Sequence, residues 1–185
     1  MCNFKSGIIL KDRVYIPSHD SHQKMLEELG IEDTRENAER VFVRAELVPA
    51  NGDKFSEPEA WSFKVDQDII PEWFVAEVDK QQMIEGVKEW MKVHVFTGVK
   101  NVKLEVKGNS KEVYYFKDCK GIEIKTNGTS SADVWTHGTS FICNMSNRPI
   151  DFSVFEDSVF KDNSTKTIYY THKWNTKQVS EQEGK

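Results

Sequence analysis

The second half of the sequence consists of short runs in which apolar and polar residues alternate, and their spacing constrains the fold more than any other feature. The apolar residues that open six successive runs are Val102, Val113, Ile122, Val134, Phe141 and Ile150. A new run begins about every 10 residues, and Gly, Asn, Asp and Ser separate the runs. The spacing predicts short β-strands, arranged either as a sandwich of antiparallel strands or as the stacked rungs of a β-solenoid.

The first half mixes strand signals with helix signals. Alternation and β-branched residues predict strands over residues 7–10, 13–16, 41–48, 61–66 and 93–96. A first helix is expected to begin at Asp20 or Ser21, because both residue types cap exposed backbone N–H groups, and to end at Gly30. The polar residues 32–39 carry neither signal.

A second helix is predicted after Asp79 and Gln82, which have the spacing of a capping box. Apolar residues then recur on one face at the period of an α-helix, namely Met83, Ile84, Val87, Trp90 and Met91. Together these elements predict an α+β fold. An N-terminal mixed or antiparallel sheet with two helices is followed by an all-β C-terminal region that is solenoid-like or sandwich-like.

Charge changes at the same place as the secondary-structure pattern. Residues 1–96 carry a net charge of −7, and residues 97–185 carry a net charge of +2. We therefore expect an acidic α+β domain over residues 1–96, a short-strand β domain over residues 97–174 and a flexible polar tail over residues 175–185.

The overall charge and the cysteine content disfavour several classes of protein. Asp and Glu outnumber Lys and Arg by 30 to 25, and direct binding to nucleic acid depends on neutralising phosphates with basic residues. Three cysteines make a poor disulfide framework. No apolar run is long enough for a signal peptide or a membrane span. We therefore expect a cytoplasmic protein that binds neither nucleic acid nor membrane directly.

Two clusters of reactive side chains could hold a metal ion, but both have simpler explanations. Residues 18–22 contain two histidines three positions apart, yet Ser and Asp in this segment are also the best helix caps. Cys119, His137, Cys143 and His172 match no standard zinc-finger spacing, and Cys143 falls on an apolar face. We predict no metal site, no cofactor and no catalytic residue.

An acidic segment followed by aromatic residues gives the predicted binding site. Asp66 and Asp68, with Glu46 and Glu72, could bind a cation, but the Gly and the closing Glu of a calcium loop are missing. Solvated surface acid is the simpler interpretation. Trp73 stands beside Phe74, so the two rings cannot both point the same way, and binding anchors are often partly exposed aromatics. Asp66, Asp68, Glu72 and Trp73 are therefore predicted to contact a partner protein.

Several segments resemble the N-terminal domain of uncharacterised bacteriophage and prophage proteins, over about residues 1–75. They are Met1–Gly7, Asp20–His22, Leu26, Leu29–Ile31, Asp33, Phe42–Leu47, Trp61–Gln67 and Pro71–Phe74. In that family a variable C-terminal part of short β elements commonly follows. The resemblance brings no known activity and no functional residue. It implies a phage setting, in which small acidic proteins often act on host machinery, including as inhibitors of CRISPR and other defences.

The leading hypothesis is a non-enzymatic, phage-type accessory protein that binds and inhibits a host protein. A nucleic-acid-binding defence factor, such as a CRISPR effector, would be engaged by an acidic surface that mimics the charge of DNA. The alternative is a small-ligand binder or an enzyme with a cleft between the two halves. The sequence does not predict the oligomeric state.

Overall fold

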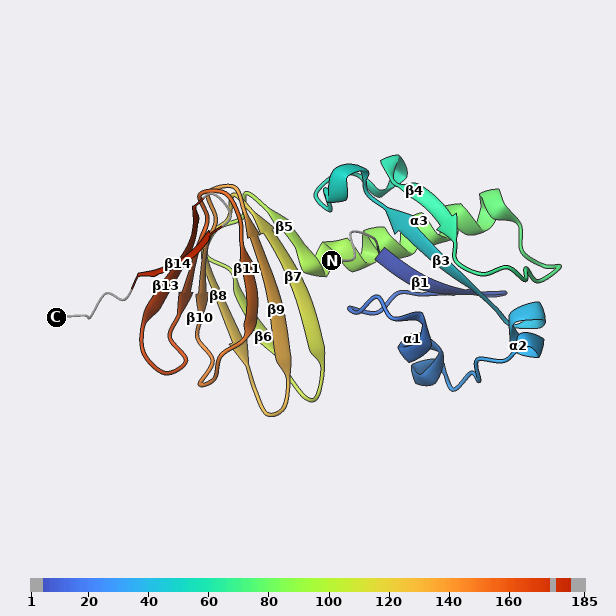
Figure 1. The fold of residues 1–185 in the computed structure, drawn as a ribbon, viewed down its shortest axis with the longest axis horizontal. Helices are drawn as coiled ribbons and strands as arrows, with labels where there is room; N and C mark the ends of the chain where they lie inside the picture. Colours follow the sequence, from blue (N-terminus) through green and yellow to red (C-terminus); the bar gives the residue numbers. More distant parts are fainter. Residues whose placement is uncertain (1–4, 174–175, 181–185) are drawn as a thin grey trace. The chain divides into compact units, whose positions relative to one another are not determined.

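The computed structural model describes the backbone of residues 5–173 and 176–180, and the side chains of residues 5–171 (Figure 1). The chain divides into two units, Met1–Val93 and His94–Lys185, which are here called unit 1 and unit 2. The boundary lies slightly before the predicted one. The α+β class is confirmed, with helices in the first part and a β-rich second part.

Unit 1 contains a four-stranded antiparallel sheet in the order β2-β1-β3-β4. The strands are β1 Lys5–Leu10, β2 Val14–Tyr15, β3 Phe42–Val48 and β4 Ser62–Val65. Two short 3₁₀ helices, Ala50–Gly52 and Pro58–Ala60, connect β3 to β4. All four strands coincide closely with predicted segments. The sheet has a hydrophobic core on each face, so the apolar residues of the strands are buried on both sides.

The two faces of this sheet pack against different helices. Helix α3 (Ala76–His94) contributes Met83, Ile84 and Val87 to a core with Ile9, Val43, Ala45 and Leu47. Helix α1 (His22–Leu29) contributes Met25 and Leu26 to a second core with Ile8, Leu10 and Phe42. Because successive residues of a strand point to opposite faces, the odd and even positions of β1 supply the two cores separately.

Helix α1 begins and ends as its sequence predicts. Ser21 is the N-cap, and its hydroxyl oxygen accepts a hydrogen bond from the backbone N–H of Lys24 at 3.3 Å. Gly30 ends the helix in the left-handed conformation, with φ of 68°. Asp20, the alternative cap, instead accepts hydrogen bonds from Lys5 and from the backbone of Ser6.

Helix α3 begins earlier than the capping box predicts. Asp79 lies within the first turn, and its carboxylate accepts a hydrogen bond from the backbone N–H of Val75 at 2.7 Å. Asp79 therefore stabilises the start of the helix from a position within its first turn, by binding a backbone N–H that precedes the helix. The helix also continues to His94, so the strand predicted over residues 93–96 is reduced to β5, Val95–Thr97.

The sequence did not predict helix α2, Arg35–Arg40. It has no buried residue and so lacks the apolar face on which helix prediction depends. Local polar contacts hold it instead. The Thr34 hydroxyl oxygen accepts a hydrogen bond from the backbone N–H of Asn37 at 3.2 Å. Ion pairs one turn apart join Arg35 to Glu39 and Arg40 to Glu36.

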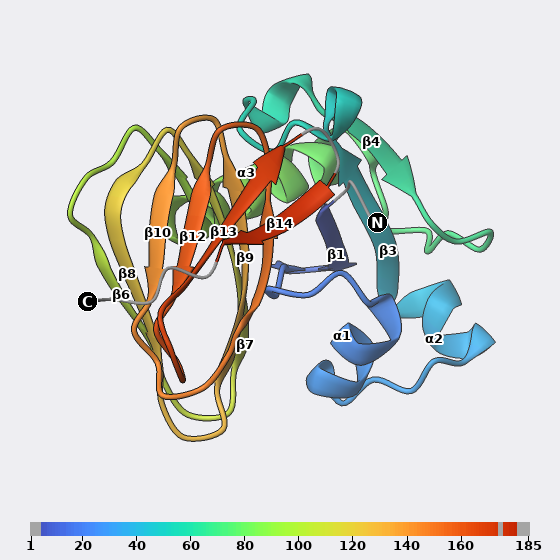
Figure 2. The same cartoon turned by 60° about the vertical axis from the view of Figure 1, so that its left-hand side comes forward.

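Unit 2 is a β-solenoid, which decides between the two predicted arrangements. One sheet has the order β11-β9-β7-β5, and the other has the order β14-β13-β12-β10-β8-β6. The chain alternates between the sheets from β5 to β12, and the neighbours in each sheet are parallel (Figure 2). The strands are β5 Val95–Thr97, β6 Lys103–Val106, β7 Lys111–Lys117, β8 Lys120–Thr126, β9 Ser131–His137, β10 Phe141–Asn144, β11 Asp151–Val154 and β12 Val159–Asp162.

Each rung of the solenoid uses two strands, so the spacing of the apolar runs in the sequence is half the length of a rung. Tyr115 pairs with Val95 and with Trp135, so the first rungs have equal lengths. Asp151 pairs with Asp133, so the last rung is slightly shorter. At one of the turns in each rung a residue adopts a positive φ, in the series Gly98, Asp118, Gly138 and Glu156.

Two further strands follow β12, and the second of them lies in the segment expected to be a flexible tail, residues 175–185. Ile168–Lys173 forms β13, antiparallel to β12, and Thr176–Ser180 forms β14, antiparallel to β13. Residues 175 and 181–185 lie outside the described residues. Thr176–Ser180 belongs to the sheet through backbone pairing with β13, although its polar composition does not indicate a strand. No helix among the described residues combines the length and apolar character needed to cross a membrane.

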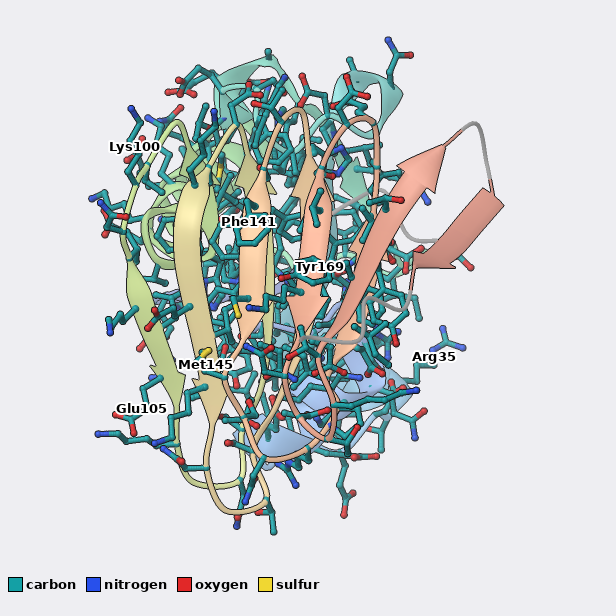
Figure 3. All side chains as sticks on the ribbon, turned by 90° about the vertical axis from the view of Figure 1, so that its left-hand side faces the viewer. Arg35, Lys100, Glu105, Phe141, Met145 and Tyr169 are labelled. Carbon is teal, nitrogen blue, oxygen red and sulfur yellow. The ribbon has the colours of Figure 1, made fainter. Side chains whose placement is uncertain are left out.

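The interior of unit 2 contains aromatic rings in contact between neighbouring rungs and between the two sheets. Phe96 stacks on Phe116 with ring centroids 5.2 Å apart, and Phe152 stacks on Phe160 at 4.3 Å. The outer face of the second sheet also carries apolar side chains, and Figure 3 shows Phe141 on β10 pointing away from the interior. Its exposed fraction is 37%, whereas that of Phe160 is 0%.

Tyr114 makes the stability of unit 2 sensitive to alkaline pH. Burial, followed by the negative charge of Glu112, raises the pKa of Tyr114 to about 12. An unfolded tyrosine titrates near about 10, so this stabilisation is complete below that pH and is lost as the pH rises toward about 12. We expect the loss to reach ~2–3 kcal/mol. Denaturant unfolding across this range measures it, and Tyr114→Phe should remove this component. The same pH dependence in both proteins would contradict the assignment.

Candidate functional site

A group of charged residues lies on the α1 side of the sheet in unit 1, along β3 and β4. Arg44 and Glu46 alternate with the apolar residues of β3 that face α3. Lys64 lies opposite Glu46 in the register of β3 and β4. Helix α1 packs on Ile8, Leu10 and Phe42, so this part of the sheet face is free to carry charge.

Three potential metal ligands meet at this surface. His22 is the first residue of α1, Glu46 lies in β3, and Asp66 follows β4 directly. One ligand atom from each lies within 4.8 Å of the others, and His22 Nδ1 is 3.2 Å from Asp66 Oδ2. The exposed side-chain fractions are 11% for His22, 9% for Glu46 and 44% for Asp66. The cluster is therefore buried at its base and open at Asp66.

Two basic side chains balance the acids around this cluster. Lys64 Nζ lies 3.6 Å from Glu46 Oε2 and 3.9 Å from Asp66 Oδ1. The Arg44 guanidinium pairs with Asp33. The Lys64 side chain is 60% exposed, so its ammonium group can leave the carboxylates with little cost in packing.

Asp66 and Asp68 line an open groove of about 590 Å³ next to the cluster. The segment is held by Gln67, between the two acids. Its side-chain oxygen accepts a hydrogen bond from the backbone N–H of Arg44 at 2.8 Å. Its side-chain amide nitrogen donates hydrogen bonds to the backbone carbonyls of Phe42 and Ile69. These bonds position the loop against β3. The sequence alone does not reveal this role, since a glutamine between two aspartates carries no distinctive signal.

The four residues predicted to contact a partner do not form one group. Asp66 and Asp68 line the groove, whereas Glu72 and Trp73 are not among its lining residues. Trp73 is half-buried against the α3 core, and its indole Nε1 donates to the Arg40 carbonyl at 2.7 Å. These contacts give Trp73 a role in the fold.

The two histidines of the 18–22 segment face different carboxylates. His19 Nε2 lies 3.0 Å from Glu28 Oε2, while His22 lies beside Asp66. Desolvation alone would raise the pKa of Glu28, but hydrogen bonds from His19 and Tyr15 leave it below its usual value. The segment therefore does not form a two-histidine metal site. His22 instead joins the acidic residues that the sequence placed in a separate group.

The cysteines of unit 2 are buried thiols. Burial raises the pKa of both Cys119 and Cys143. The Cys119 thiol donates to the carbonyls of Phe96 and Lys117, each at 3.3 Å. Among the described residues, His22, Glu46 and Asp66 are the one group of three or more ligands close enough to share an ion. The side chain of His172, considered with the cysteines above, lies outside the described residues.

Comparison with known proteins adds no assignment. No family model matches the sequence, and no curated protein or solved structure matches it either. The resemblance to bacteriophage and prophage proteins gains no support from these comparisons and stays a prediction.

Proposed function

We propose that the protein is a non-enzymatic binding protein that takes an extended, basic segment of a partner protein along β4. The observation that carries this proposal is the position of β4, which is the last strand of the sheet order β2-β1-β3-β4 and pairs with β3 alone in that sheet. An edge strand presents unpaired backbone N–H and C=O groups and is a template for strand addition by a partner. Asp66 directly follows this strand, and Asp68 lies two residues further along the chain.

The charge of the segment after β4 supports a basic partner. Asp66 and Asp68 are exposed, as is Glu72. Within the described part of the chain, neither Asp68 nor Glu72 makes an ion pair, whereas Asp66 shares Lys64 with Glu46. Asp66 and Asp68 line the same groove, and Glu72 follows four residues later in the chain. Charges separated by less than a Debye length, about 8 Å at physiological salt, act together. Basic surfaces are typical of proteins that bind nucleic acid, and inhibition of such a protein is the consequence we propose.

The proposal predicts that association depends on the three acids. In the variant Asp66→Asn/Asp68→Asn/Glu72→Gln, we expect association with a Lys- and Arg-rich extended peptide to slow about tenfold or more and to lose most of its salt dependence. Stopped-flow or surface-binding kinetics at several salt concentrations measure both quantities. An unchanged association rate would place the interface elsewhere.

A matched variant controls for the change in net charge. Asp12, Glu77 and Glu85 line a separate groove of unit 1. Neutralising these three acids removes the same charge from the same unit. We expect this control to keep nearly the full association rate and its salt dependence. An equal slowing in both variants would show that net charge alone drives binding, which contradicts a role for the segment beside β4.

A further inference from the structure

The His22 ring has acceptor atoms beside both of its nitrogens. Nε2 lies 3.3 Å from the Ala45 carbonyl oxygen, and Nδ1 lies 3.2 Å from Asp66 Oδ2. A neutral imidazole has one N–H and one lone pair. When Nε2–H donates to Ala45, the lone pair of Nδ1 faces a carboxylate oxygen, and that contact is repulsive without a positive charge between the two atoms.

We propose that His22, Glu46 and Asp66 form a binding site for a divalent transition-metal ion. The ion would supply the missing positive charge between Nδ1 and the carboxylates. The bond from Nε2 to the Ala45 carbonyl would then be the outer contact that fixes the tautomer and the orientation of a metal-binding histidine. This proposal does not depend on the binding function proposed above.

Glu46 is the second, independent observation. Its side chain is more than nine-tenths buried and faces the other two ligands. Among the described residues it makes one ion pair, to Lys64 Nζ at 3.6 Å, which is longer than a hydrogen bond. A buried carboxylate is costly unless it is paired or coordinates a metal. Lys64 compensates this charge only partly, so a closer cation would be favoured.

The ligand atoms need only a small adjustment to bind one ion. Zinc binds nitrogen and oxygen ligands at about 2.0–2.2 Å, so two ligand atoms of one ion are at most about 4 Å apart. The three atoms are already within 4.8 Å of one another, and Asp66 is the exposed member that can rotate. Three protein ligands leave further coordination positions for water or for a group from another molecule.

The ligand types indicate which ions fit. Imidazole suits zinc, cobalt and related transition metals, whereas magnesium and calcium prefer oxygen ligands alone. Lys64 Nζ is near both carboxylates and would have to move away when the ion enters. The Lys64→Gln substitution should therefore strengthen metal binding.

Titration of the full-length protein with Co²⁺ tests the site, since the absorption spectrum of Co²⁺ reports its ligands. We expect one Co²⁺ per chain, no thiolate-to-cobalt charge-transfer band, and no displacement by Mg²⁺ at similar concentration. His22→Ala should weaken binding at least about 10- to 100-fold. His19→Ala is the matched control, because His19 faces Glu28, and it should leave the affinity unchanged.

Three results would overturn the proposal. They are the absence of saturable Co²⁺ binding, a thiolate band that assigns the ion to cysteine, and an affinity that His22→Ala leaves unchanged. The absence of binding would leave the contact between His22 and Asp66 as part of the fold alone. Should His22→Ala not fold, Asp66→Asn alters the exposed ligand and must show the same loss. Because no partner protein is present, the result is separate from the test of the proposed function.

Discussion

Substitution of Asp20 by Ala is expected to destabilise unit 1 by ~3–5 kcal/mol, because it leaves a buried ammonium group without its counter-ion. Lys5 has no exposed surface, and its Nζ donates to Asp20 Oδ1 at 2.7 Å and to the His19 carbonyl at 3.1 Å. Asp20 Oδ1 also accepts from the Ser6 backbone N–H at 3.0 Å. Desolvation lowers the pKa of Lys5 although Asp20 opposes this shift. Chemical denaturation of the full chain, followed by tryptophan fluorescence, measures the loss.

An exposed ion pair provides the control. Asp12 Oδ2 lies 3.9 Å from a guanidinium nitrogen of Arg13, and both side chains are well exposed. Asp12→Ala should therefore lower the free energy of unfolding by less than about 1 kcal/mol. The double variant Lys5→Met/Asp20→Asn should recover most of the stability, since it removes the buried charge itself. Equal effects of Asp20→Ala and Asp12→Ala would contradict the importance of the buried pair.

Substitution of Phe160 by Ala is expected to destabilise unit 2 by ~3–5 kcal/mol. The ring is fully buried in the solenoid interior and stacks on Phe152. Phe160 also pairs with Ile142 on β10 and with Tyr170 on β13. The cavity would therefore weaken contacts between neighbouring strands, on which the stability of a solenoid depends. The midpoint of denaturant unfolding measures the effect.

Phe141 is the matched control for this cavity. It occurs in the neighbouring strand β10, but its side chain is on the outer face and 37% exposed (Figure 3). Phe141→Ala removes the same atoms and should cost much less, about 1 kcal/mol or below. A loss as large as that of Phe160→Ala would show that the outer face contributes to stability as much as the interior does.

Most local elements of the fold could be predicted, but their pairing could not. Ser21 and Gly30 mark the ends of α1 because capping is decided by neighbouring residues. Alternation shows which residues of a strand point inward, but it does not show whether the neighbouring strand is parallel. The repeat of the rungs was nevertheless visible at the turns, where Gly108 and Gly128 both adopt a positive φ. A search for glycines that recur at a constant interval would have favoured the solenoid.

The candidate site was less predictable because it depends on tertiary contacts. His22, Glu46 and Asp66 lie far apart in the sequence and match no motif. They meet because β4 pairs with β3 and α1 packs on the same side of the sheet. From the sequence alone, His22 is therefore interpreted as part of a helix start and the carboxylates as solvated surface acid. Gln67, which holds the loop, has a role that only its hydrogen bonds reveal.

Hydrogen exchange tests the central claim, that β4 is the strand on which a partner is bound. With a saturating Lys- and Arg-rich extended peptide, we predict slower exchange of those amides in Ser62–Val65 that do not bond to β3, and little change in β2 at the opposite edge. The same peptide with proline at its centre, which cannot complete the ladder, should protect β4 less. Binding without any protection of β4, or with protection confined to another part of the chain, would contradict the account.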